Sequence, residues 1–154
     1  MAIKQGKHDP RAWLALVLGL CLAFSVRAQP VVAEQAWARA TVPNQTASGA
    51  FMRLTAKQDV TLIGARSPDA SVVEVHEMKM DDGIMRMRPV GALPIKAGQT
   101  IELKSGGYHL MMMNLKRQLK AGDAVALTLE FKSADGRVST VDVKATARLT
   151  PPGP

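Results

Sequence analysis

The side chains best suited to bind a metal ion are two histidines and seven methionines that lie between residues 76 and 113. In a β-strand, alternate residues lie on the same face. If this stretch forms strands, each histidine therefore has thioether side chains beside it. Two strand faces carry such groups: His76 with Met78 and Met80, and His109 with Met111 and Met113. Met85 and Met87 share a third face.

This combination of ligands favours one metal ion over others. Soft sulfur donors together with imidazole select Cu(I), whereas zinc sites use thiolate or carboxylate, and calcium and magnesium need oxygen. A thioether has no proton to lose and forms no disulfide, which suits reversible binding in an oxidising compartment. The residues therefore predict a Cu(I) site.

A structural explanation competes with this prediction. Methionine fills irregular cores well, and a methionine stripe alone is more often packing than ligation. The coincidence favours the metal, because both histidines that follow residue 28 lie inside the methionine-rich stretch. Met52, which lies outside it, is assigned to the core. Glu77 is expected to be solvated or paired with Arg86 or Arg88 rather than to bind metal.

The N-terminus resembles a secretory signal peptide. Basic residues precede an apolar run over residues 12–24, and small residues around Ala28 suit cleavage after that position. A run of 13 residues is too short for a transmembrane helix, which needs about 20. We therefore expect export to the periplasm and no membrane span in the mature form. Lipid attachment at Cys21 is disfavoured by the bulky Leu20 and Leu18 before it.

Removal of residues 1–28 changes the composition of the chain. The whole sequence has a formal charge of +7 and one cysteine, whereas the mature part has a charge of +4 and none. Disulfides, multi-cysteine zinc sites and iron–sulfur clusters are thereby excluded. An aromatic content of 4% is too low for a base-stacking platform, so no nucleic-acid partner is expected.

The mature chain is predicted to be one all-β domain over residues 29–149, followed by a frayed, disordered tail at 150–154. Short β-prone runs alternate with turn residues, as in sandwiches and barrels, and no long stretch has a helical period. The runs span residues 31–40, 50–56, 60–65, 71–80, 84–90, 100–104, 108–115, 123–131 and 137–147.

The metal-binding stretch also resembles a known family. His76, ten intervening residues, Met87, twenty-one intervening residues and then His109-Leu110-Met111 match the H-X10-M-X21-H-X-M pattern of the periplasmic copper chaperones called PCuAC, formerly DUF461. The similarity extends from about residue 36 to residue 143.

The resemblance implies a cupredoxin-like Greek-key β-sandwich that binds one Cu(I) at a partly exposed site. By resemblance, the ligands are His76, Met87, His109 and Met111. The family is implicated in supplying copper to the CuA centre of cytochrome c oxidase subunit II, often alongside Sco-type proteins. Some relatives carry a second site in a His- and Met-rich C-terminal extension. The segment after Val143 has neither residue type, so one high-affinity site is expected.

Other functions are weighed on the same residues. A blue-copper electron carrier needs a cysteine thiolate, and the mature chain has none. The metal-binding stretch shows no Ser-His-carboxylate arrangement, so the chain is not expected to be an enzyme. Two alternatives stay open. One is an exported β-sandwich binding module whose His and Met side chains are structural, and the other is a copper buffer without a delivery role.

Overall fold

The computed structural model describes residues 29–153, and all regular structure in this part is β-strand. The predicted all-β fold is confirmed. No helix in residues 29–153 is long and apolar enough to cross a membrane. The strands are β1 (Val31–Arg39), β2 (Ala47–Ala56), β3 (Val60–Arg66), β4 (Ala70–Asp81), β5 (Ile84–Pro89), β6 (Leu93–Ile95), β7 (Thr100–Leu103), β8 (Tyr108–Leu115), β9 (Ala124–Ser133) and β10 (Val138–Arg148).

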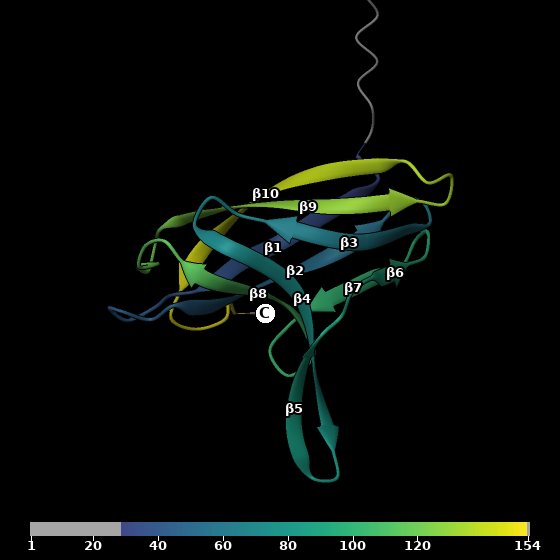
Figure 1. The fold of residues 1–154 in the computed structure, drawn as a ribbon. Helices are drawn as coiled ribbons and strands as arrows, with labels where there is room; N and C mark the ends of the chain where they lie inside the picture. The colour runs from purple at the N-terminus through teal and green to yellow at the C-terminus, as the bar shows by residue number, and fades with distance from the viewer. Residues whose placement is uncertain (1–28, 154) are drawn as a thin grey trace, which may run out of the picture.

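The strands form one continuous sheet that closes on itself. Its order is β5-β4-β8-β2-β1-β10-β9-β3-β6, and an additional β3–β4 pairing closes the ring (Figure 1). β1 and β10 pair in parallel, and the other pairings are antiparallel. The sandwich or barrel predicted from the spacing of the strands is therefore a closed, barrel-like sheet. Strands β5, β6 and β7 lie outside the ring, and β7 pairs with β2.

The core fills the interior of this closed sheet. Residues at alternate positions of the ring strands point inward, as the period of a strand requires. Met52 is among them, so its assignment to the core is confirmed. The largest fully buried side chains are Phe131, Leu54, Leu62, Ile95, Leu110, Met112, Leu119, Leu127, Leu129, Val31, Val125 and Val141.

All nine predicted runs contain strands, but the sequence analysis missed β6. This strand has only three residues, Leu93, Pro94 and Ile95, which are too few to show an alternating pattern. A proline also argues against a central strand, and β6 is in fact at the edge of the sheet. The predicted signal peptide and Cys21 lie outside the described residues. The disordered tail stays a prediction.

A bulge in β1 changes which side chains face outward. The pairing with β2 shifts between Glu34 and Trp37, and Gln35 has a φ of 53°. Such a bulge adds one residue to one strand and reverses the inside-outside alternation beyond it. Val31 lies inside before the bulge, and Ala38 lies inside after it. Trp37 is therefore placed on the outside of the barrel, opposite Phe51 of β2.

β4 and β5 form a hairpin that projects from the barrel (Figure 1). Asp81 and Ile84 are its last paired residues, and Asp82 and Gly83 make the two-residue turn. Both turn residues have positive φ, 48° and 77°, as a type I′ turn requires. This turn matches the right-handed twist of the strands, so it fixes the register of the whole hairpin.

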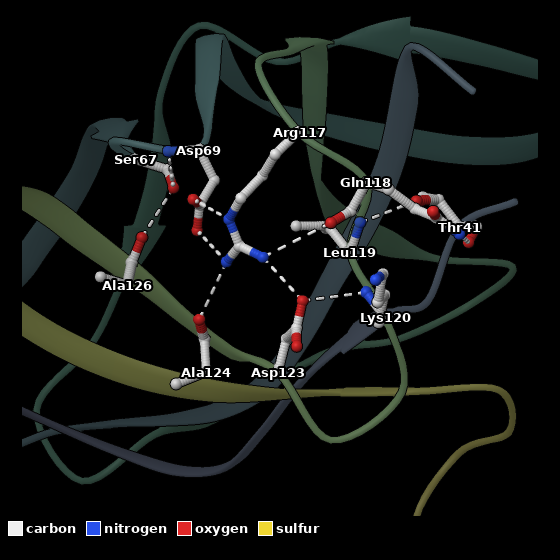
Figure 2. Close-up of polar contacts among 10 residues, drawn as sticks. All are labelled: Thr41, Ser67, Asp69, Arg117, Gln118, Leu119, Lys120, Asp123, Ala124 and Ala126. Carbon is white, nitrogen blue, oxygen red and sulfur yellow. Dashed lines mark hydrogen bonds and ion pairs between the residues drawn. The ribbon is translucent and has the colours of Figure 1, made fainter. Parts of the chain in front are cut away.

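Arg117 connects the start of β4 with the end of β8, at the end of these strands away from the hairpin (Figure 2). Its guanidinium donates two hydrogen bonds to Asp69, with Nε–Oδ1 and Nη2–Oδ2 distances of 2.6 and 3.0 Å, and a third of 2.7 Å to Asp123. Nη2 also donates to the carbonyl of Ala124. Because these partners lie at the start of β4 and β9, Arg117 joins both strands to the end of β8.

Candidate metal centre

His76 of β4 and His109 of β8 lie directly opposite each other. Their ring centroids are 6.0 Å apart with an interplanar angle of 59°. The next pair along these strands is Val75, just before His76, and Leu110, just after His109. Both of these residues belong to the core and point into the barrel. The two histidines therefore lie on the outer face, yet their exposed fractions are only 9% and 5%.

An aromatic row runs across the outer face and ends at these histidines. Trp37 stacks on Phe51 with ring centroids 4.4 Å apart, and the Phe51 and His109 centroids are 6.3 Å apart. Gly49 makes room for Phe51, because a Cβ at this position would lie 2.7 Å from the tip of the ring. The row covers β1, β2, β8 and β4 in sheet order and supports the histidines from one side.

A backbone carbonyl orients His109. Nδ1 of His109 lies 3.0 Å from the carbonyl oxygen of Gly107, which can only accept, so Nδ1 carries the proton. The same oxygen accepts a 3.1 Å hydrogen bond from the backbone N–H of Met78, which fixes the loop before β8 against β4. The lone pair of His109 is thereby on Nε2.

Glu74 orients His76. Nε2 of His76 lies 3.0 Å from a carboxylate oxygen of Glu74, so in the neutral ring Nε2 is the donor and Nδ1 holds the lone pair. This Nδ1 is buried and has no hydrogen-bond partner in the protein. A buried, unpaired acceptor costs free energy, and a metal ion would satisfy it. A carboxylate on the other ring nitrogen is the usual support of a metal-binding histidine.

The spacing of the two rings fits one shared ion. Two imidazoles bound to one metal at about 2 Å hold their centroids roughly 5 to 6 Å apart, and the observed distance is 6.0 Å. In residues 29–153, no three His, Cys, Asp or Glu side chains group closely enough to hold a metal ion. Methionine side chains lie beside the histidine pair and offer soft sulfur donors.

The two methionines of the predicted ligand set lie on either side of His76. Met111 is two residues from His109 on the same face of β8, is half-buried and pairs with Glu74. Met87 of β5 pairs with Met78, two residues beyond His76 along β4. Diagonal neighbours of this kind are roughly 7 to 8 Å apart at the backbone, within reach of a long side chain. Met87 is 46% exposed.

The projecting hairpin has two different faces. One carries Met78, Met80, Met85 and Met87, and the other carries charged residues. Arg88 donates two hydrogen bonds to Glu77, at 2.9 and 3.2 Å, so the predicted pairing of Glu77 is confirmed. This hydrogen bonding lowers the pKa of Glu77. Glu77 therefore stabilises the hairpin on the face opposite the thioethers.

Sequence reasoning missed the groups that orient the histidines. Glu74 is two residues before His76 on the same strand face, and this period-2 signal would have identified it. The carbonyl of Gly107 carries no side-chain signal. The approach of Phe51 to His109 depends on the register of β2 against β8 and on the space left by Gly49. The sequence alone does not indicate this contact, because the two strands are distant in the chain.

The family of the chain follows from comparison with known proteins. A family model described as "Putative lipoprotein LpqE-like" matches residues 31–145. The chain belongs to this family, which is that of the PCuAC domains. The resemblance noted in the sequence is thereby confirmed.

Two curated proteins are similar to this chain. A protein of Leifsonia xyli subsp. xyli, described as "Putative lipoprotein Lxx21020", is 34% identical over 118 residues, which are 76% of this chain and 70% of the relative. An uncharacterized Rickettsia prowazekii protein is 27% identical over 115 residues, 71% of this chain and 64% of that protein. The lipoprotein descriptions agree with the predicted export to the cell envelope.

Solved structures of the same family include copper-bound ones. The Cu(I) form of DR1885 from Deinococcus radiodurans is 36% identical, with a TM-score of 0.57, covering 80% of this chain and 81% of that one. Its apo form is 30% identical, with a TM-score of 0.57 and coverages of 97% and 98%. The copper-bound PCuAC domain of PmoF2 is 21% identical, with a TM-score of 0.59 and coverages of 78% and 95%, and shows likeness of fold.

Proposed function

We propose that this LpqE-like protein is a periplasmic copper chaperone without enzymatic activity. It binds one Cu(I) as cargo through His76, Met87, His109 and Met111. It delivers the ion to a cuproenzyme, for which we propose the CuA centre of cytochrome c oxidase subunit II, directly or with a Sco-type protein.

One observation carries the copper-binding part of the proposal. The buried Nδ1 of His76 has no protein partner, and the ring faces His109 across two adjacent strands. Hydrogen bonds from the other ring nitrogens fix both tautomers so that one lone pair per ring is free. A structural histidine would be expected to use both nitrogens. The half-buried Met111 adds a soft donor beside them, which favours Cu(I) over zinc.

The different exposure of the ligands supports a delivery role. The two histidines are buried, whereas Met87 is 46% exposed on a projecting strand. All four proposed donors are neutral, and Cu(I), with its filled d shell, imposes no strict geometry. An acceptor thiolate, which is a stronger donor, can therefore displace Met87 first and the buried ligands later. Stepwise exchange of this kind transfers the ion without releasing it to water.

Metal analysis and a transfer assay test the proposal. The mature chain, residues 29–154, should bind one tight equivalent of Cu(I), and the His76→Ala/His109→Ala variant should lose it. The loaded protein should then form the CuA spectrum when mixed with the apo CuA domain and the required oxidant. Tight binding without transfer would support a copper buffer. Metal-free protein that ignores added Cu(I) would support the binding module with structural histidines.

A further inference from the structure

Four methionines form two cross-strand pairs on one face of the β4–β5 hairpin. Met78 lies opposite Met87, and Met80 lies opposite Met85 nearer the turn. Directly opposite residues share a face and have Cβ atoms about 5 Å apart. The hairpin therefore presents two successive rungs of thioethers, and the next residue of β4 on the same face is His76.

Packing does not explain the outer rung. Methionine is usually a filler of cores, but Met80 and Met85 are 57% and 51% exposed, and neither belongs to the core. Every residue of β5 is exposed, so this strand contributes no buried face to the barrel. Core packing therefore does not account for methionine at these two opposite, half-exposed positions.

The opposite face of the hairpin already has a structural role. Glu77 pairs with Arg88, and Asp81 pairs with Arg86 at 3.3 Å. Together with the Asp82-Gly83 turn, these ion pairs hold the two strands in register without help from the methionines. The thioether face is therefore free to bind a ligand.

The chemistry of this face selects a soft monovalent ion. The two methionine rungs offer only thioether sulfur, which excludes the usual ligand sets of zinc, calcium and magnesium. Cu(I) accepts such donors, and two or three of them suffice for weak binding because the ion has no geometric preference. Residues two apart on a strand are about 7 Å apart. An ion that moves between neighbouring rungs therefore travels a distance that long side chains can span.

We propose that Met78, Met80 and Met85 form a second, weaker Cu(I) site on the hairpin. The ion passes between this site and the histidine pair through Met87. The inference rests on the proposed function, since it assigns an entry and exit path to the same centre. It adds one weak equivalent to the single tight equivalent expected from the sequence.

Anaerobic Cu(I) titration of residues 29–154, labelled with ¹³C at the methionine methyl groups, tests the inference. The first equivalent should shift the methyl signals of Met87 and Met111, and the second those of Met80 and Met85. A competing Cu(I) chelator should remove the second equivalent first. The Met80→Leu/Met85→Leu variant should keep the first equivalent and lose the second. The matched control is Ile84→Leu, an exposed apolar position on the opposite face of the same hairpin, which should keep both.

The His76→Ala/His109→Ala variant separates this inference from the proposed function. If both are correct, the variant loses the tight equivalent and its Met80 and Met85 signals still shift. A wild-type protein that binds one equivalent and shows no shift of Met80 or Met85 at excess Cu(I) overturns the hairpin site alone. A double-histidine variant that binds like the wild type overturns the proposed histidine centre and leaves the hairpin site standing.

Discussion

The rings of His76 and His109 face each other across β4 and β8 with centroids 6.0 Å apart, and each ring is oriented through one nitrogen by a different acceptor. Glu74 orients the first and the carbonyl of Gly107 the second. The free lone pairs are therefore set by hydrogen bonds within the protein before any metal arrives. A preorganised pair of this kind binds without a cost for ordering its side chains.

Substitution of the two proposed methionine ligands should weaken Cu(I) binding without unfolding the protein. Leucine conserves the volume of methionine, so Met87→Leu and Met111→Leu should each reduce the affinity by roughly tenfold or more, which is about 1.4 kcal/mol. Competition with a Cu(I) chelator measures this, and circular dichroism checks the fold. The account of the ligand set is wrong if both variants keep the wild-type affinity.

Loss of the carboxylate behind His76 should also weaken binding. Glu74→Gln keeps the size of the side chain but provides a weaker acceptor for Nε2, and changes behind a metal ligand typically cost about 10- to 100-fold in affinity. Glu102→Gln is the matched control, because Glu102 pairs with Lys104 on β7 and the adjoining loop. Equal Cu(I) affinities of the two variants would remove Glu74 from the site.

The packing of the aromatic row should be sensitive to a side chain added at Gly49. A Cβ added there would lie 2.7 Å from the Phe51 ring, which contacts Trp37 on one side and lies beside His109 on the other. Gly49→Ala should therefore cost about 1–3 kcal/mol of stability and shift the emission of Trp37, the only tryptophan after residue 28. Gly91→Ala, where a Cβ meets no atom within 4 Å, is the control. Unchanged Trp37 emission in Gly49→Ala would contradict the packing described.

The Arg117 cluster should make stability depend on pH. A backbone hydrogen bond from Lys120 and then the Arg117 side chain lower the pKa of Asp123 below 3.8. A lowered pKa contributes stability above the unfolded value, near pH 4, and this contribution is lost as the pH falls through the folded value. Arg117→Gln should therefore be less stable than the wild type at pH 7, and the gap should narrow on acidification. The difference in stability between the two proteins is measured from their urea midpoints at pH 7 and at a pH below 4. A difference that widens in acid would refute this role of Arg117.

The strand pattern and the faces of the metal-binding stretch could be predicted from the sequence because both follow from a period of two. That period placed Leu110 and Met112 on the face opposite His109, and the structure shows that this face points into the barrel. The Asp82-Gly83 turn was readable from its residue types. The family pattern supplied the proposed ligand set, and the two histidines of that set lie opposite each other in the structure.

The missed features depend on contacts that a local pattern does not contain. The position of Trp37 follows from the bulge at Gln35, and the single β3–β4 pair at Ala65 and Val73 closes the sheet. Strand β6 is too short to show alternation. The exposure of Met87 depends on the hairpin extending beyond the barrel, which the lengths of β4 and β5 alone do not indicate.

X-ray absorption of the protein loaded with one equivalent of Cu(I) tests the central claim most directly. The account predicts a mixed shell of nitrogen and sulfur at the copper, with two imidazoles from His76 and His109 and sulfur from Met87 and Met111. The His76→Ala/His109→Ala variant should lose the imidazole scattering. A copper shell of the wild type that contains no imidazole, or contains no sulfur, would contradict the account.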